Sequence, residues 1–323
     1  MLLLEGLLPT LEGSLRTPER IEMFFVYSLV WALGGPLVVD AGHNADWRKE
    51  FDANFRGAFG AVPFPKDGQV FDFFYDPLSG AGEFVHWAAV VPEYAASAIE
   101  VNHQFKSIVI NTVDSVRITS LVDTLVQNRH AAMLVGSAGT GKTTLINHYL
   151  RGLDESKLLS CNITMNYFTD SATMQGLIDG AIDKRSGRIF GPPASKRMIY
   201  FVDDINLPYI EDYGTQNSME LLRQLVQHGS YFDRSDLSFR KEIHDTQQLA
   251  AMNPLIGSFS ISERNQRDYA VFACEMPSLS DLMTIYNGIF AGHLSLEGCG
   301  PKLMAVSQSI TMATITLHSE VTK

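Results

Sequence analysis

The sequence has few of the residues from which disulfide frameworks, metal sites and nucleic-acid surfaces are built. Its 323 residues include three cysteines, an odd number and far apart, so we expect neither disulfides nor a cysteine metal site and infer a reducing compartment. Scattered histidines such as His130 and His148 show no metal-ligand spacing. The formal net charge of −11 leaves no basic excess for binding phosphate backbones, so no nucleic-acid partner is expected.

The sequence also lacks an uninterrupted apolar run long enough for a membrane span. Met23–Val39 is uncharged, but a Gly-Gly-Pro sequence at 34–36 breaks any helix there. We expect a buried helix over Ile21–Leu33 and a turn after it, with Thr17 as the N-cap and Pro18 in the first turn. The first residues lack the basic segment of a signal peptide. No membrane partner is therefore expected.

What the sequence does contain is a phosphate-binding pattern. Residues 136–143 read Gly-Ser-Ala-Gly-Thr-Gly-Lys-Thr, which matches G-x-x-x-x-G-K-[S/T]. An apolar run precedes the pattern and a predicted helix follows it, as in a strand–loop–helix phosphate cradle. An ordinary glycine turn is the alternative. The residues expected to contact a nucleoside phosphate are Gly136, Ser137, Ala138, Gly139, Thr140, Gly141, Lys142, Thr143 and Thr144.

Two acidic residues follow a second apolar strand. Met198–Val202 is uncharged and ends in Asp203 and Asp204, which would lie beside the phosphate loop if both strands belong to one parallel sheet. Lys142 would then reach the β- and γ-phosphates, while Thr143 and Asp203 would hold Mg²⁺. Asp204 would orient or deprotonate the attacking water. A helix-capping turn is the alternative interpretation of the acidic pair.

An amide and two arginines extend the candidate site. Asn253 follows the apolar strand Gln247–Met252, where it could hydrogen-bond the γ-phosphate or the lytic water; a plain turn before Pro254 is equally consistent. Arg264 and Arg267 lie in a polar turn, and either could face a neighbouring subunit's nucleotide, because arginine stabilises transferring phosphate. A solvated helix face is the alternative.

Strand and helix patterns alternate along the centre of the chain, which predicts an α/β fold with a parallel, doubly wound sheet flanked by helices. Before that region the pattern predicts an amphipathic helix over Ala45–Phe59 and a β-hairpin of Val70–Tyr75 and Glu83–Ala88. Strands are expected at 107–111, 131–136, 161–167, 198–203, 246–252 and 270–274, and helices at 112–127, 142–151, 171–183, 217–228 and from 279 onward.

Taken together, these motifs resemble dynein heavy chain of the axonemal type, over about residues 100–295. The resemblance is to the third AAA+ module of that chain, a P-loop NTPase, and residues 1–95 resemble the segment that closes the preceding module. An Asp-Asp pair at the acidic position is typical of the axonemal branch. Five segments carry the match: Gly136–Thr144, Phe201–Pro208, Asp212–Gln216, Leu221–Gln224 and Ala250–Pro254.

The resemblance implies three domains. Residues 1–95 would be a helical subdomain with a β-hairpin that closes the preceding AAA+ module, and 96–278 the large α/β subdomain. Residues 279–323 would begin a helical small subdomain that is truncated at Lys323, so a sensor 2 arginine is not assigned.

The resemblance also implies residue roles. Lys142 and Thr143 correspond to the Walker A motif, Asp203 and Asp204 to the Walker B motif, and Asn253 to sensor 1.

Two further roles depend on the same match. Arg264 or Arg267 falls at the arginine-finger position, with Arg267 favoured, and would serve the nucleotide of the preceding module. Ile108–Asn111 corresponds to the strand that contacts adenine.

The implied activity is binding and slow hydrolysis of ATP, with Mg²⁺, to regulate the microtubule motor cycle. ATP is preferred to GTP because the chain has no Asn-Lys-x-Asp guanine-binding motif. Implied partners are the other AAA+ modules of the same heavy chain, dynein intermediate and light chains, and microtubules, in the cytoplasm and cytoskeleton of the ciliary axoneme. Asp204 replaces the usual Glu and is one methylene shorter, so the alternative is a non-catalytic nucleotide-binding module of the motor ring.

Overall fold

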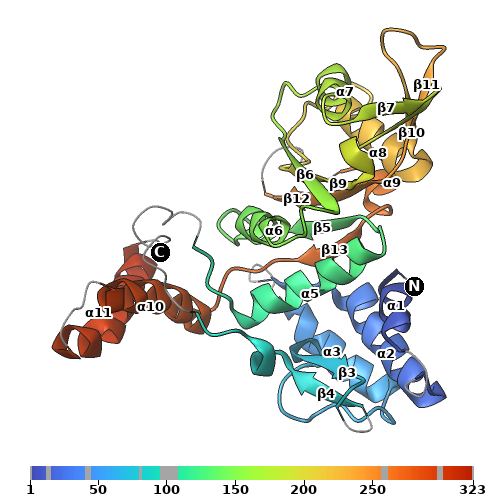
Figure 1. Ribbon diagram of the computed structural model, residues 1–323. Helices are drawn as coiled ribbons and strands as arrows, with labels where there is room; N and C mark the ends of the chain where they lie inside the picture. The colour runs from blue at the N-terminus through green and yellow to red at the C-terminus, as the bar shows by residue number, and fades with distance from the viewer. Residues whose placement is uncertain are drawn as a thin grey trace. The chain divides into compact units, whose positions relative to one another are not determined.

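The computed structural model describes residues 2–11, 16–40, 45–79, 82–94, 108–255, 261–296 and 301–321. The chain forms two compact units: Met1–Val85 with Ser120–Glu275, and His86–Thr119 with Met276–Lys323 (Figure 1). The linear division into 1–95, 96–278 and 279–323 stays a prediction. Among the described residues, no helix combines the length and apolar character that crossing a membrane requires.

The first unit begins with helices. α1 (Leu2–Leu7) and a 3-10 turn, η1 (Leu8–Thr10), precede α2 (Pro18–Gly34). The predicted cap of α2 is confirmed, because Thr17 Oγ1 accepts a hydrogen bond from Arg20 N at 3.4 Å and Pro18 occupies the first turn. The expected buried helix is confirmed as well, since α2 buries Phe24, Val26, Tyr27, Val30 and Trp31.

The predicted amphipathic helix is α3 (Trp47–Ala58). It begins two residues later than expected because Asp46 is its N-cap, with Oδ1 accepting from Lys49 N at 3.0 Å. A short antiparallel ribbon of β1 (Val39–Asp40) and β2 (Ala45–Asp46) leads into it.

The predicted hairpin is confirmed, but its strands are shorter at their outer ends. β3 (Phe73–Asp76) pairs with β4 (Glu83–His86), whereas 3-10 turns η3 (Val70–Asp72) and η4 (Trp87–Val90) take the flanking residues. The Asp72 carboxylate accepts from Gln69 N at 2.8 Å, and His86 Nδ1 accepts from Ala88 N at 3.0 Å. These local bonds offer the backbone an alternative to the strand ladder.

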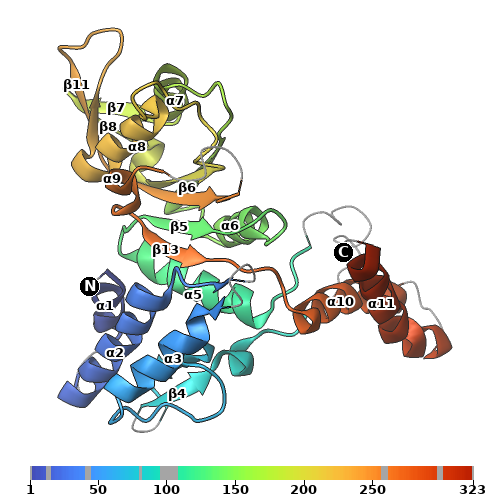
Figure 2. The same cartoon turned by 180° about the vertical axis from the view of Figure 1, so that it is seen from behind.

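A five-stranded sheet of order β13-β5-β12-β9-β6 forms the centre of the first unit, and each adjacent pair is parallel (Figures 1 and 2). Its strands are β5 (Ala132–Val135), β6 (Leu158–Thr164), β9 (Arg197–Asp203), β12 (Thr246–Met252) and β13 (Ala270–Ala273). The connecting helices include α6 (Lys142–Arg151), α7 (Ser171–Asp179) and α8 (Asn217–His228). The predicted α/β fold with a parallel sheet is confirmed, and α6, α8 and β12 have the predicted bounds.

β6 begins and ends three residues earlier than the predicted strand at 161–167. Met165 N still donates to Asp203 O at 2.9 Å, but the chain then turns. Asn166 Oδ1 accepts from Phe168 N at 2.9 Å, an Asx turn that ends the extended conformation.

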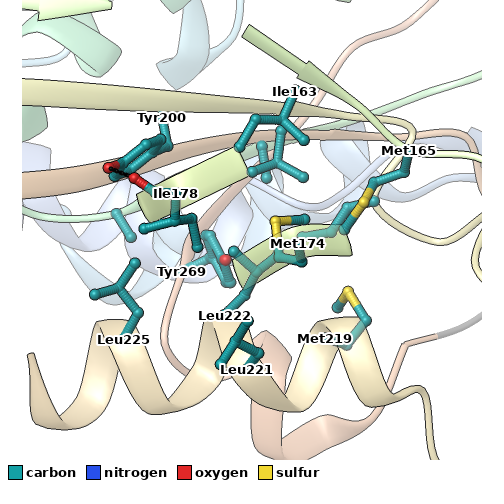
Figure 3. Packing of buried hydrophobic residues seen from close by; sticks show 14 of the residues in the cluster. Ile163, Met165, Met174, Ile178, Tyr200, Met219, Leu221, Leu222, Leu225 and Tyr269 are labelled. Atoms are coloured by element: carbon teal, nitrogen blue, oxygen red, sulfur yellow. Dashed lines mark hydrogen bonds between the residues drawn. The ribbon is translucent and has the colours of Figure 1, made fainter. Parts of the chain in front are cut away.

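Helices α7 and α8 contribute apolar side chains to a buried core against one face of this sheet (Figure 3). Met174 and Ile178 of α7 and Leu222 of α8 pack in the same cluster as Tyr200 of β9. Burying a side chain of this size contributes roughly 1.5–3 kcal/mol. The core therefore anchors β9, and with it Asp203 at the end of that strand.

A second, four-stranded sheet was not predicted. Its order is β10-β11-β8-β7, formed by β7 (Asp183–Ser186), β8 (Ile189–Gly191), β10 (Ser230–Phe232) and β11 (Arg240–Ile243). The helix predicted over 171–183 is wrong in its last part, because α7 ends at Asp179. Lys241 Nζ lies 2.9 Å from Asp179 Oδ2 and 2.8 Å from Asp233 Oδ2, and so joins this sheet to the end of α7.

The second unit contains α10 (Leu279–Leu296) and α11 (Pro301–Val321), as the helical pattern from 279 onward predicted. α5 (Val113–Gln127) starts in this unit and ends in the first. The strand predicted over 107–111 is wrong for Ile108–Asn111, which form no strand, and Ser107 lies outside the described residues. Thr112 N donates to Ser115 Oγ at 2.8 Å, so this segment leads into a capped helix rather than a ladder.

Candidate functional site

The glycine loop, residues 136–141, joins β5 to α6 at the carboxyl end of the parallel sheet. Gly136 N donates to Met252 O at 3.1 Å, which ties the start of the loop to the end of the neighbouring strand. A Cβ at Gly136 would lie 2.1 Å from Cys274 O, so only glycine fits there. Gly139 and Gly141 have φ of +85° and +82°, which glycine adopts at no steric cost. A glycine loop that leads into a helix N-terminus in this way offers backbone N–H groups to an anion.

Lys142 places its ammonium inside this loop. Nζ donates to Gly136 O at 2.7 Å, Ser137 O at 2.8 Å and Thr140 Oγ1 at 3.2 Å, and the residue is 8% exposed. Burial lowers the pKa of Lys142, while the nearby Cys274 thiol and the two acidic side chains raise it. The loop thus holds a cation without an ion pair in the part of the chain that the structure describes.

Thr143 and Asp203 meet across the mouth of the loop. Thr143 Oγ1 donates to Asp203 Oδ2 at 2.8 Å, although the two residues are sixty positions apart in the sequence. A hydroxyl and a carboxylate side by side are hard oxygen ligands of the kind that Mg²⁺ takes in small number, since it keeps most of its waters. No group of three or more His, Cys, Asp or Glu residues in the described ranges could hold a metal ion.

Asp204 is half-buried next to this pair and has a backbone φ of +53°. A left-handed conformation costs most non-glycine residues roughly 1–2 kcal/mol, and aspartate is among the few that adopt it as single residues. Its amide donates to Asp203 Oδ1 at 3.1 Å. Burial raises the pKa of Asp204, the neighbouring Asp203 raises it further, and Lys142 opposes both effects. A carboxylate with a raised pKa is a stronger base, which suits proton abstraction from water.

Asn253 lies at the same edge of the sheet, directly after β12, the strand between β5 and β9. It is 7% exposed, and its Oδ1 accepts from Leu255 N at 3.1 Å. This contact fixes the side-chain amide within its own turn. The structure therefore brings the glycine loop, the two acids and Asn253 together at one edge, as the sequence predicted.

Comparison with known sequences identifies the family. The profile of the P-loop containing dynein motor region matches residues 97–277, and that of the dynein heavy chain AAA lid domain matches residues 1–89. The chain belongs to the dynein heavy chain family. The resemblance seen in the motifs is thereby confirmed.

Full-length members of this family are much longer than the chain. The chain is 34% identical to dynein axonemal heavy chain 17 of Homo sapiens over 304 residues. This aligned stretch covers 94% of the chain and 7% of the relative. Identity is 35% over 303 residues, with the same two shares, to the ciliary dynein beta chain of Tripneustes gratilla. For the flagellar outer arm dynein beta chain of Chlamydomonas reinhardtii it is 35% over 322 residues, 99% of the chain and 7% of the relative. The chain thus spans about 7% of the length of these dyneins.

In this dynein motor region the two candidate arginines lie on the surface. Arg264 belongs to the short helix α9 (Glu263–Gln266), and Arg267 is its C-cap. Both are exposed, and Arg267 Nε is 3.7 Å from Asp268 Oδ1. Both guanidinium groups are therefore accessible at the surface of this unit. The finger role stays a prediction, as does the adenine contact of Ile108–Asn111, which belong to the second unit.

Two buried amides near the site were missed by sequence reasoning. Asn206 is 1% exposed and its Nδ2 donates to Asn253 O at 2.9 Å. Gln216 is 7% exposed and its Nε2 donates to Pro208 O at 2.7 Å. Both residues lie in segments that carried the dynein resemblance, but no periodicity shows that a polar side chain in a loop turns inward.

Proposed function

We propose that this chain is an ATP-binding AAA+ module of an axonemal dynein heavy chain, and that it binds and slowly hydrolyses Mg-ATP. The observation that carries the proposal is the hydrogen bond of 2.8 Å between Thr143 Oγ1 and Asp203 Oδ2 at the mouth of the glycine loop. This contact brings the two predicted magnesium ligands together beside Lys142. A plain glycine turn or a helix-capping acidic pair gives no reason for these two side chains to meet.

The residues present fit a magnesium nucleotide. An added Cβ at Gly141 would meet nothing within 4 Å, and Lys142 would supply positive charge to the phosphates. Thr143 and Asp203 would hold Mg²⁺, which when bound neutralises charge on the β- and γ-phosphates. Within Gly136–Thr144, the start of α6 and the backbone N–H groups that follow Gly136 would contact the phosphates, since Gly136 N itself donates to Met252 O.

Hydrolysis would rest on Asp204 and Asn253. Asp204 would orient a water and accept its proton, helped by the raised pKa of its carboxyl. Asn253 would orient the same water or the γ-phosphate without adding negative charge. Arg267 would act on the nucleotide of the preceding module, because arginine stabilises charge on a transferring phosphoryl group. The module would in turn need an arginine from its own neighbour.

The names of the relatives support the proposal that this function belongs to a motor. They are axonemal, ciliary and flagellar dyneins, so we infer that the chain works in the ciliary axoneme within the cytoskeleton. Its partners would be the other AAA+ modules of the same heavy chain and, through the full motor, intermediate and light chains and microtubules. Nucleotide state would then regulate the microtubule motor cycle. No nucleic-acid or membrane partner is proposed.

A second candidate function is a nucleotide-binding module that does not hydrolyse. It is favoured by the side chain of Asp204, one methylene shorter than Glu, on a backbone at φ of +53°. A shorter carboxylate reaches less far, and a misplacement of about 1 Å can cost up to about 100-fold in rate. Bound ATP would then stiffen the ring without turnover.

Asp204→Asn separates the two candidates. The amide has nearly the same shape but accepts no proton, so we expect ATP affinity within about 2-fold of wild type and a loss of about 100-fold or more in single-turnover hydrolysis. Asp212→Asn, an exposed acid in the loop after the site, is the matched control and should change neither. Undiminished hydrolysis in Asp204→Asn would refute the assigned role. Wild-type ATP that stays intact and bound would favour the non-catalytic module.

A further inference from the structure

Asn206 is a buried amide between the two chain segments that carry Asp204 and Asn253. It lies two residues after Asp204, is 1% exposed, and donates from Nδ2 to Asn253 O at 2.9 Å. A buried polar side chain is costly unless it is bonded, so this contact strongly favours one position of the side chain. Asn206 therefore fixes the backbone of the Asn253 turn to the backbone of the acidic turn.

The acidic turn needs such restraints. Asp204 has a φ of +53°, a conformation that a non-glycine residue keeps only where its surroundings hold it. Leu207 N donates to Asp204 O at 3.0 Å, and Ile205 N donates to Ala251 O at 3.1 Å. Together with the bond from Asn206 to Asn253 O, these bonds hold residues 205–207 either to the turn itself or to the chain at the end of β12.

Gln216 restrains the other end of the same loop. It is 7% exposed, directly precedes α8, and donates from Nε2 to Pro208 O at 2.7 Å. Residues 204–208 are therefore held on one side by the Asn253 turn and on the other by the start of α8. These contacts leave the turn little freedom to relax toward a right-handed backbone.

We propose that Asn206 is a positioning residue for ATP hydrolysis, because it sets the separation of the Asp204 and Asn253 turns so that both side chains reach one water. This inference rests on the proposed hydrolytic function and adds a residue to it. Because the Asp204 side chain is short, its backbone must be placed accurately for the carboxylate to reach the water. A misplacement of about 1 Å can cost up to about 100-fold in rate. Asn206 touches neither nucleotide nor water in this account, and it acts through the two turns.

The test compares Asn206→Leu with Gln248→Leu in the full chain. Leucine keeps roughly the shape of asparagine but donates no hydrogen bond. Gln248 is the control, because it is 2% exposed and lies within β12 rather than at its end. It donates to Leu222 O at 3.3 Å and accepts from the Tyr269 hydroxyl at 2.6 Å, so its replacement removes at least as many buried hydrogen bonds. In single-turnover assays we expect Asn206→Leu to lower the hydrolysis rate about 10- to 100-fold with ATP affinity within about 2-fold, and Gln248→Leu to leave both within about 2-fold.

Amide hydrogen exchange without nucleotide supplies a readout that does not depend on activity. Loss of one buried hydrogen bond should speed exchange at Ile205 and Leu207 about 10-fold in Asn206→Leu and leave it unchanged in Gln248→Leu.

The possible outcomes separate this inference from the proposed function. A wild-type chain that hydrolyses ATP, with equal rate and equal exchange in Asn206→Leu, overturns the positioning role alone. A wild-type chain without hydrolysis overturns the proposed activity, and with it the catalytic meaning of Asn206, whereas faster exchange would still show that Asn206 restrains the turn. The expected result is that Asn206→Leu loses both hydrolysis rate and protection from amide exchange, whereas Gln248→Leu loses neither.

Discussion

Gly136→Ala offers a sharp test of how the glycine loop is built. A Cβ at this position would lie 2.1 Å from the carbonyl oxygen of Cys274 and 3.1 Å from its carbonyl carbon. The obstacle is backbone that cannot move easily, because Cys274 N donates to Val135 O at 2.7 Å and Ala273 N donates to Gly35 O at 2.8 Å. Real Cβ atoms essentially never come within 3.0 Å of another heavy atom, so the loop or the Cys274 carbonyl has to shift by about 1 Å.

The expected cost follows from overpacking a rigid site. Inserting a methyl group into well-packed surroundings destabilises by about 1–3 kcal/mol, and the backbone obstacle places Gly136→Ala toward the upper end of that range. Because the start of the loop also bonds to Met252 O, the same shift disturbs the phosphate cradle, and we expect ATP affinity to fall by at least about 10-fold.

Gly176→Ala is the matched control. Gly176 lies within α7, is exposed, and has nothing within 4 Å of an added Cβ. Alanine there should stabilise by about 0.5–1 kcal/mol, since glycine in a helix interior costs about that much. Urea unfolding and nucleotide titration measure both variants. The reasoning is refuted if Gly136→Ala unfolds within about 0.5 kcal/mol of wild type and binds ATP with unchanged affinity.

Two further predictions concern charged groups. Lys241→Met removes the cation between Asp179 and Asp233, and because all three side chains retain some exposure we expect a loss of about 2 kcal/mol in the free energy of unfolding. Lys157→Met, at an exposed pair with Asp154, should leave the free energy of unfolding unchanged. Equal effects of the two substitutions would contradict the stabilising role of Lys241. Since burial raises the pKa of Asp204 and the side chain must be deprotonated to act as a base, the single-turnover rate should fall as pH drops through a pKa above the ordinary value of about 3.9. A rate constant that stays level down to about pH 4 would rule out Asp204 as that base.

Much of the parallel sheet could be predicted because β5, β9 and β12 are largely buried, mostly apolar runs, and because β5 is followed by a glycine and β9 ends in an acidic residue. β12 and the helices α6 and α8 have the predicted bounds, since in each a recognisable pattern of apolar residues ends at a residue that interrupts it. The second sheet was missed for the opposite reason. All four residues of β7, Asp183–Ser186, are exposed and polar or charged, so no alternation marks them as a strand.

The candidate site was predicted to the extent that its residues follow strands. The meeting of Thr143 with Asp203 follows from two parallel strands that end at one edge, which sequence order and topology rules anticipate. The left-handed backbone of Asp204 and the inward turn of Asn206 do not follow from any period. They depend on tertiary hydrogen bonds to Ala251 and Asn253, which only the folded chain supplies.

The most direct test of the central claim is the affinity of the full chain for ATP and ADP, with and without Mg²⁺, in wild type and in Lys142→Ala. A hydrogen bond to a charged group contributes about 1.5–3 kcal/mol, so loss of the Lys142 ammonium should weaken ATP binding about 10- to 150-fold. Lys157→Ala, an exposed lysine of similar size, should leave the affinity unchanged. Tight, Mg²⁺-dependent binding that Lys142→Ala weakens about 10- to 150-fold is the predicted result. No binding by wild type, or equal binding by Lys142→Ala, would contradict the account.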